Sequence, residues 1–325
     1  MDRLFKKIWF FGLAFLCMIV FAGENDLFAQ ETFRIEHTFP VPGKYLMNVK
    51  SATEMITHLG QKETPNLTDQ DQTWSYTVDP EKDGKQVIRL QLNKFAMTSK
   101  INDQQVLDFE SGNPAKQNEL LTPMYDAMIK SEILCRTENG KPVGLEGFDQ
   151  MWERMEKDSK PETKAMLEMI KKQMSDHQFT EILLMSVKFF PRGRDVKTGD
   201  TWDVDFDQNV PMIGNMKGKT LCTLKNVEVK DGLHIAVIET KGEIASGENS
   251  SASIPGAPSI SLKKVNVKIE GSIEYVFETG VVPKNISTNI MEMEMEMPVP
   301  GNAEKITLSV SGKTQSTVLM KKAEN

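Results

Sequence analysis

The sequence predicts an α+β fold: two mainly antiparallel β-meander halves, forming a curved sheet or an open barrel, with a central block of three short helices. Stretches of alternating apolar and polar residues, separated by Asn-Gly, Asp-Gly and Pro-rich turns, occur in both halves of the chain. Between them, from residue 147 to 188, apolar residues recur at the spacing of amphipathic helices. Such helices have to bury their apolar sides, and the predicted sheet is the only surface of adequate size.

An export signal is expected at the start of the chain. Three basic residues precede an apolar stretch, 8–22, which is short for a membrane-spanning helix. Cleavage is expected after Ala22 or Ala29, and we favour Ala29. The sequence therefore predicts a signal peptide at 1–29 and an exported protein of the periplasm or extracellular space, with no transmembrane segment after signal removal.

The N-terminal β-rich half is assigned to residues 30–146. A short helix is expected at 122–129, with Thr122 as N-cap and Pro123 at the first helical position. A hairpin of 131–137 and 141–145 follows, closed by an Asn-Gly pair that favours a type I′ turn. Strands are expected at 33–39, 45–49, 73–78, 86–92, 94–101 and 105–109.

The helical block is assigned to residues 147–188. Each of its three expected helices carries one apolar stripe, and capping boxes begin the second at Ser159 and the third at Ser175. The stripes are Phe148, Met151, Trp152 and Met155; then Met166, Met169, Ile170 and Met174; then Phe179, Ile182, Leu183 and Phe190.

The C-terminal β-rich half is assigned to residues 189–325. Its start, Asp203-Val-Asp-Phe-Asp207, is similar to a calcium-binding loop, but Gln208 and Gly214 stand where such a loop needs Gly and Glu. We therefore interpret it as a strand with one solvated face. Further strands are expected at 219–229, 233–244, 264–278, 282–297 and 306–320.

A methionine-rich strand is the most unusual feature of this half. Four methionines share one face and three glutamates share the other. The strand is interpreted first as part of the core, with a solvated acidic side. A flexible methionine wall also suits a lipid or another apolar guest, and thioethers suit Cu(I). The methionines are Met291, Met293, Met295 and Met297.

Two cysteines, Cys135 and Cys222, remain after signal removal. An exported chain meets an oxidising compartment, so a disulfide between them is one prediction. Both lie in apolar, strand-like surroundings, so two free buried thiols are the alternative.

Common catalytic and cofactor-binding patterns are missing from the sequence. The four histidines are far apart, and no zinc, phosphate-loop, dinucleotide or nucleophile-elbow motif occurs. The formal charge of −7 argues against a nucleic-acid partner, which requires clustered basic residues. We therefore expect a non-enzymatic protein without metal or cofactor.

The segment between the helical block and the C-terminal β-rich half is rich in turn residues and basic side chains. Pro191, Gly199, Asp200 and Trp202 are interpreted as a structural hinge: they end the last helix, turn the chain and anchor the next strand. A second interpretation is that the basic residues of the hinge grip an anionic group. These residues are Arg192, Arg194 and Lys197.

The phrase Phe189-Phe-Pro-x-x-x-x-Val196-x-x-Gly199-Asp-x-Trp202 follows a Gly-turn hairpin that ends at Gly147. A Gly-turn hairpin followed by this phrase resembles the pattern of a family of uncharacterised exported bacterial proteins, which is known only as a domain of unknown function. The resemblance implies β-meanders to the end of the chain and no catalytic residues. Many members of that family are lipoproteins, whereas here Leu16 stands where a lipobox before Cys17 needs a small residue.

Taken together, the patterns predict an exported, non-enzymatic protein that binds an apolar or amphipathic ligand such as a lipid in the cell envelope. The alternative is a structural or interaction protein with a solid core and an envelope protein as partner. Copper binding by the methionine strand is a remote third possibility.

Overall fold

The structure is a computed structural model, and it describes residues 31–119, 121–158, 171, 188–210, 214–246, 251–252, 260–298 and 305–323. The predicted signal peptide lies outside the described residues. So do most of the second and third predicted helices of the central block, and much of the polar loop after residue 246.

Most of the described chain forms one 13-stranded sheet in which every pair of neighbours is antiparallel. In spatial order its main strands are β7 (Lys141–Glu146), β6 (Ile133–Glu138), β4 (Lys85–Ile101), β3 (Lys62–Val78), β2 (Gly43–Leu59), β15 (Lys305–Lys322), β14 (Lys284–Pro298), β13 (Ile260–Val276), β11 (Leu233–Ser246), β10 (Gly214–Lys230) and β9 (Thr201–Val210). β5 (Gln104–Glu110) also pairs with β4, and β12 (Ser251–Ala252) with β13. A separate two-stranded sheet joins β1 (Phe33–Ile35) to β8 (Arg194–Val196).

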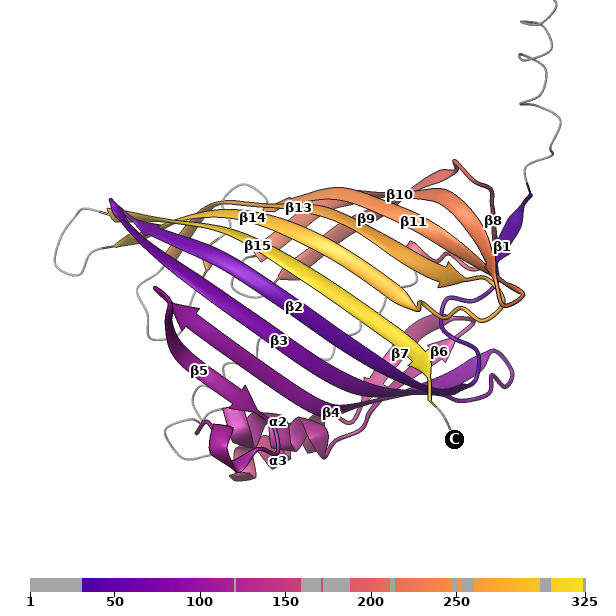
Figure 1. The fold of residues 1–325 in the computed structure, drawn as a ribbon, viewed down its shortest axis with the longest axis horizontal. Coiled ribbons are helices and arrows are strands. Elements are labelled where there is room, and N and C mark those ends of the chain that lie inside the picture. The colour runs from indigo at the N-terminus through magenta and orange to yellow at the C-terminus, as the bar shows by residue number, and fades with distance from the viewer. Residues whose placement is uncertain are drawn as a thin grey trace, which may run out of the picture.

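The sheet is curved, and its long strands run side by side across the molecule (Figure 1). Two meanders meet at its centre, where β2 pairs with β15. The expected mainly antiparallel, curved β-structure is therefore confirmed. Several strands are longer than predicted: β2 and β3 have 17 residues each and include 50–59 and 62–72, which the sequence left unassigned. The strand expected at 33–39 is shorter, because β1 covers only Phe33–Ile35.

Tight turns connect several neighbouring strands as predicted. Asn139 and Gly140 both have positive φ, 51° and 75°, which is the geometry of a type I′ turn. Asp83-Gly84 and Asp231-Gly232 have nearly the same angles. These local pairs fix the register of the strands on either side.

Two α-helices lie in the described residues, α2 (Leu121–Ile129) and α3 (Phe148–Asp158), together with a short 3₁₀ turn, η1 (Pro114–Lys116). The expected short helix is α2, but the predicted cap is wrong. Asn118 Oδ1 accepts from the Leu121 backbone N–H at 3.1 Å, and Thr122 Oγ1 accepts in return from the Asn118 N–H. A side chain three residues before Leu121 therefore caps the helix.

The central three-helix block is matched only in part. Its first helix is α3, and the predicted stripe of Phe148, Met151, Trp152 and Met155 is buried. This stripe packs against α2 and the start of β6 through Ala127 and Ile133. α2 in turn covers β4, where Tyr125 stacks on Phe95 with ring centroids 3.7 Å apart. The two helices thus lie together beside β4 and β5 (Figure 1).

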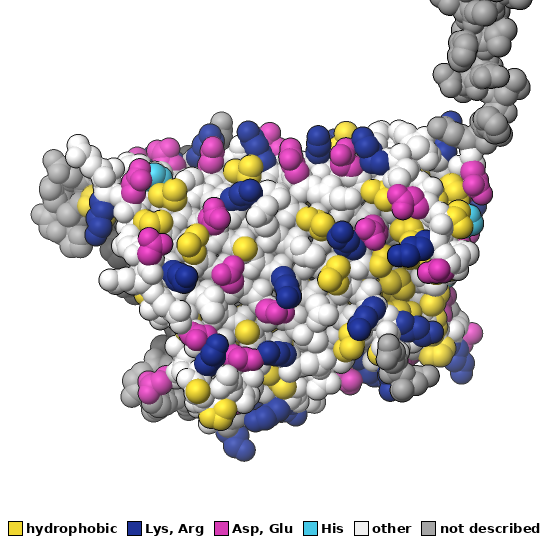
Figure 2. All heavy atoms as spheres, in the orientation of Figure 1, with side chains coloured by type: hydrophobic (Ala, Val, Ile, Leu, Met, Phe, Trp, Pro, Cys, Tyr) yellow, Lys and Arg dark blue, Asp and Glu magenta, His cyan; other side chains and the backbone are white. Residues whose placement is uncertain are grey.

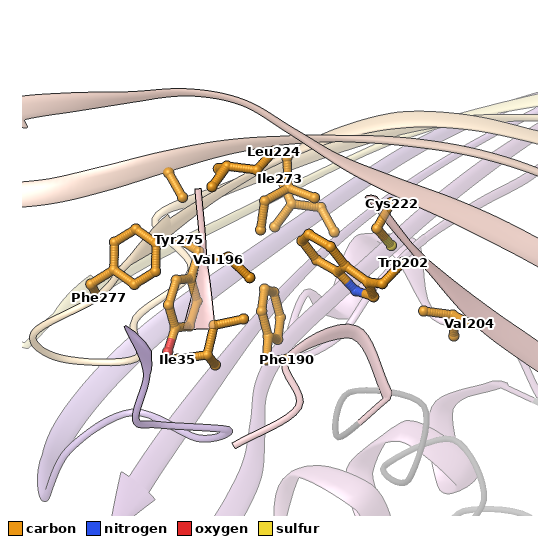
Figure 3. Packing of buried hydrophobic residues seen from close by; sticks show 12 residues of the cluster. Ile35, Phe190, Val196, Trp202, Val204, Cys222, Leu224, Ile273, Tyr275 and Phe277 are labelled. Carbon is orange, nitrogen blue, oxygen red and sulfur yellow. The ribbon is translucent and has the colours of Figure 1, made fainter. Parts of the chain in front are cut away.

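A second core, which we call the hinge core, lies where β1, the 188–196 segment and β8 pack on β9, β10, β11 and β13. Figure 3 shows its side chains converging from these elements. Phe190 stacks on Tyr275 with ring centroids 4.7 Å apart, and Trp202 is 5% exposed. The hinge core consists of Ile35, Phe190, Val196, Trp202, Val204, Cys222, Leu224, Ala236, Ile238, Ile273, Tyr275 and Phe277.

Glycines stand where neighbouring strands come closest. Gly218 lies on β10, Gly242 on β11 and Gly271 on β13, and each is two residues from the position that pairs with the glycine of the neighbouring strand. A Cβ added to Gly218 would collide with the Glu243 carbonyl oxygen of β11. Glycine inside a strand marks such close backbone approach and allows a sheet to bend.

None of the helices in the described part of the chain is long and apolar enough to cross a membrane.

Candidate binding face of the sheet

Charged side chains of the long strands lie on one face of the sheet, which we call the convex face. Figure 2 shows positive and negative groups interspersed on the side turned to the viewer. Cross-strand ion pairs such as Lys219–Asp203 and Lys217–Asp207 occur between neighbouring strands of this face. Its charged positions include Lys50, Glu54, Asp69, Asp71, Asp203, Asp205, Asp207, Lys217, Lys219, Glu239, Lys241, Glu243, Lys268, Glu270, Glu292, Glu294 and Lys313.

The opposite, concave face is uncharged over its central part. Residues that pair across neighbouring strands form rows that cross the sheet from β9 to β4. On the concave face, five of these rows pass through Val49, Ser51, Thr53, Met55 and Thr57 of β2. None of the described residues in these five rows is Lys, Arg, Asp, Glu or His. The row of Thr53, for example, reads Val204, Thr220, Gly242, Ile269, Asn289, Thr314, Thr53, Thr68 and Ser99. An uncharged face of this extent suits contact with an apolar phase better than with water.

A hollow of about 320 Å³ lies on this concave face. Side chains from every main strand between β2 and β9 line it, which shows that the sheet curves around it. Its volume is at the lower end of the range for small-molecule sites. The lining residues are Thr53, Met55, Phe206, Met216, Ile244, Val265, Val267, Ile269, Asn289, Met291, Gly312 and Thr314.

One side of the hollow is apolar. Met216, Ile244, Leu262 and Val265 are buried, and they pack with half-buried residues that include Phe206, Val267, Met293 and Met295. The predicted alternation of the methionine strand is confirmed here: Met291 and Met293 are half-buried, whereas Glu292 and Glu294 are exposed. Met291 lines the hollow. Met297 belongs to β14, where it pairs with Ile306.

The other side of the hollow is neutral but polar, and we call it the neutral stripe. It consists of hydroxyl and carboxamide side chains on β14, β15, β2, β3 and β4. Thr53 and Thr314 share a hydrogen bond of 3.1 Å, and Thr68 donates to Ser99 at 3.2 Å. The stripe contains Ser287, Asn289, Thr314, Ser316, Ser51, Thr53, Thr68, Gln70 and Ser99.

The basic residues of the hinge lie away from this hollow and contact protein groups. Arg192 pairs with Glu81 at 3.5 Å. Arg194 donates to the Thr201 carbonyl at 3.2 Å, and its guanidinium lies 5.4 Å from the centre of the Trp202 ring. Lys197 has an exposed side chain. The structure therefore does not bring the three predicted cations together with the methionines.

The remaining hinge residues occupy a turn before β9. The helical turn at Lys188 and Phe189 ends before Pro191, and Gly199 has a φ of 92°. The Asp200 carboxylate accepts from the Lys197 backbone N–H at 3.0 Å. Trp202 Nε1 donates to the Phe189 carbonyl at 3.3 Å, which ties the two sides of the turn together.

Two basic side chains cover the edge of β9 that pairs with no strand among the described residues. The Asp200 carbonyl accepts from Leu224 on β10, so in the antiparallel pattern the odd-numbered residues of β9 direct their carbonyls outward. Arg194 donates to the outward carbonyl of Thr201, and Lys188 donates to that of Asp205 at 3.1 Å. This is protection of an edge strand against pairing with another chain.

Cys135 and Cys222 are both free and buried, which is the second of the two arrangements expected from the sequence. They belong to different cores: Cys222 lies in the hinge core and Cys135 packs with Tyr76 and Ile88. Burial raises the pKa of the Cys135 thiol to about 11. Burial, aided by the negative charge of Asp203, raises the pKa of the Cys222 thiol to about 12.

Because the thiolate is the reactive form, we expect neither thiol to react with a maleimide in the folded protein at pH 8. In guanidinium chloride without reductant, both thiols become exposed and both should be labelled. Intact-protein mass spectrometry counts the labels. Unfolded protein that takes up label only after reduction would show a disulfide and contradict the structure.

Most residues of the hollow were missed by the sequence prediction, which named only the methionines. Hydrophobic alternation could not find the neutral stripe, because Ser, Thr, Asn and Gln are polar like the charged residues beside them. Charge alternation was the available signal: on β2, Lys50 and Glu54 stand at even positions, whereas Ser51, Thr53 and Met55 stand at odd ones.

The described residues contain no group of three or more His, Cys, Asp or Glu side chains that could hold a metal ion.

Comparisons with known proteins give a family but no activity. A family model described as a family of unknown function (DUF6263) matches residues 83–282, which is more than half of the chain. No curated protein matches the sequence at a significant level.

Two solved structures illustrate the structural similarities. One is lipovitellin, studied for its lipid–protein interactions, with 8% identity and a TM-score of 0.41; the match covers 87% of this chain but 26% of that one. The other is the outer membrane protein OprG from Pseudomonas aeruginosa, with 8% identity, coverage of 89% and 100%, and a TM-score of 0.23. TM-scores below 0.5 do not establish a shared fold, so neither structure informs the function of this chain.

Proposed function

The chain belongs to the DUF6263 family of unknown function, and on that premise we propose that it is an exported, non-enzymatic protein that binds an apolar or amphipathic ligand, such as a lipid, on the concave face of its sheet. The predicted signal peptide supports export. The family itself supplies no activity, so the proposal depends on the face and its hollow.

The unequal distribution of charge between the two faces carries the proposal. Along the second half of β14, from Met291 onward, the convex positions are glutamates and the concave positions are methionines, and the same separation of charged from uncharged residues extends over the neighbouring strands. Core packing alone does not require it, because in the rows from that of Val49 to that of Thr57 the concave residues of β2 and β3 are half-buried rather than fully buried. A partly covered, charge-free hollow is a suitable surface for hydrocarbon.

The physical driving force is removal of apolar surface from water. Burial contributes roughly 25 cal/mol for each Å² of apolar surface, so an alkyl chain that covers the methionine side of the hollow gains several kcal/mol before ordering costs. Methionine side chains adapt to guests of different shape because they are unbranched and flexible. We therefore expect broad tolerance of chain length.

The direct test is to purify the exported protein without detergent and examine it by native mass spectrometry and by lipid analysis of an organic extract. A co-purifying lipid, and an increase in the fluorescence of an environment-sensitive apolar dye, are the expected results. A protein that carries no extractable lipid and does not bind the dye would refute the proposal and favour a structural protein with a solid core.

A charge placed in the hollow should abolish ligand binding. In Met291→Glu a carboxylate replaces a half-buried thioether on the floor of the hollow, and an ionised group without a partner strongly disfavours hydrocarbon contact. We expect about tenfold or weaker dye binding with little loss of stability. The measurement is a fluorescence titration with thermal unfolding alongside it.

The adjacent residue supplies a matched control. Ile290 is on the same strand but on the convex face, where it is 47% exposed. Ile290→Glu introduces the same charge one residue away and should leave dye affinity unchanged. Equal effects of the two substitutions would show that the binding surface is not the concave face.

A further inference from the structure

The neutral stripe distinguishes this hollow from a plain hydrocarbon pocket. It enters the hollow through Thr53, Asn289 and Thr314, which face the apolar residues Phe206 and Met216 across the curve of the sheet. Neighbouring strands are about 4.8 Å apart, so the path from β2 to β9 measures roughly 29 Å along the arc. A ligand on this path would meet polar groups at one end and apolar groups at the other.

The polar groups retain hydrogen-bonding capacity. Thr53 and Thr314 form one bond with each other, which within the described residues leaves one hydroxyl hydrogen and further acceptor positions available. The Asn289 carboxamide makes no hydrogen bond with another side chain in the described part of the chain. All three side chains are half-buried, so an occupant of the hollow would remove them from water.

The polar but uncharged side of the hollow sets opposing limits on the ligand. Pure hydrocarbon would desolvate the Asn289 carboxamide and the unused hydrogen-bonding positions of the two hydroxyls without offering them partners, which is unfavourable. An ionised head group would find no opposite charge, because the surrounding concave rows are neutral. Uncharged carbonyl or hydroxyl groups satisfy both limits.

We propose that the hollow selects uncharged lipids whose ester, amide or hydroxyl groups lie on Thr53, Asn289 and Thr314 while their alkyl chains lie on the apolar side. This selectivity rests on the proposed binding function. The expected ligand is an uncharged lipid with carbonyl or hydroxyl groups next to its alkyl chains. Free fatty acid anions and plain alkanes are not expected to be preferred ligands.

The test compares three probes on delipidated protein: dioleoylglycerol, hexadecane and oleate at pH 8. Wild-type protein should bind dioleoylglycerol most tightly. The triple variant Thr53→Val, Thr314→Val and Asn289→Leu keeps the side-chain volumes similar and removes the hydrogen-bonding groups. Since each hydrogen bond contributes modestly, we expect about tenfold weaker binding of dioleoylglycerol and equal or tighter binding of hexadecane.

A matched control is available on the other face of the same strands. Thr288 on β14 and Thr317 on β15 lie on the convex side, and Thr288→Val with Thr317→Val should change no affinity. Strongest binding of oleate, or equal loss for hexadecane and dioleoylglycerol in the triple variant, would overturn the selectivity while leaving apolar binding intact. Absence of binding for all probes would instead overturn the proposed function. If the triple variant failed to fold, the ranking of the probes on wild-type protein would still decide the question.

Discussion

Replacement of Trp202 by Ala should lower the free energy of unfolding by about 3–5 kcal/mol, the range for removal of a large aromatic side chain from a core. Trp202 is 5% exposed and belongs to the hinge core, where segments from distant parts of the chain meet. Its indole N–H also holds the Phe189 carbonyl. The loss therefore combines a cavity with an unpaired carbonyl.

Equilibrium unfolding in urea, followed by far-ultraviolet circular dichroism, measures this change. Trp202→Phe is the control, because it keeps an aromatic ring in the core and removes only the hydrogen bond and part of the volume. The free energy of unfolding should fall clearly less in Trp202→Phe than in Trp202→Ala. A Trp202→Ala protein within about 1 kcal/mol of wild type would mean that the hinge core does not hold β9 in place.

A single methyl group at Gly218 should also be strongly destabilising. The added Cβ would lie against the Glu243 carbonyl of the next strand, and backbone atoms there cannot move aside without opening the β10–β11 ladder. Overpacking of this kind costs about 1–3 kcal/mol. Gly218→Ala should therefore lower the unfolding midpoint in urea, and dye binding should weaken because the strands around the hollow separate.

Gly144→Ala on β7 is the matched control, since nothing lies within 4 Å of a Cβ at that position. It should be neutral or slightly stabilising, because alanine restricts the unfolded chain more than glycine does. If both alanine variants unfolded at the same urea concentration, the tight strand approach at Gly218 would be disproved.

Local signals predicted much of this fold. Asn139-Gly140 and Asp83-Gly84 adopt the left-handed turn geometry that short hairpins need, and the apolar stripe of α3 is buried as its spacing indicated. The strand interpretation of Asp203–Asp207 is confirmed by β9. These features depend on neighbouring residues alone.

The unassigned stretch 50–72 shows where the sequence signal failed. Its residues form much of β2 and β3, yet Ser51, Thr53 and Gln70 face the concave side, so both faces of these strands are polar. When both faces of a strand are polar, its sequence shows no alternation of apolar and polar residues. The strands are stabilised by long ladders on both sides, a non-local contribution that no short window contains.

The candidate site was predicted less well than the fold. The methionine strand was identified because its alternation is strong, but its apolar neighbours Met216 and Val265 come from other strands. Arg192 and Arg194 were considered for binding because they are cationic. Their contacts with Glu81 and Thr201 could be known only from the structure.

The pairing of β2 with β15 has a consequence for the order of folding. Thr53 and Thr314 are separated by 261 positions, so their strands can meet only after a large loop closes, which is slow compared with formation of the hairpins on either side. Each meander can form early, but both then carry an open strand edge that is prone to aggregation. We therefore expect the hollow, which spans this seam, to form late in folding, and a chaperone to be needed until the two meanders join.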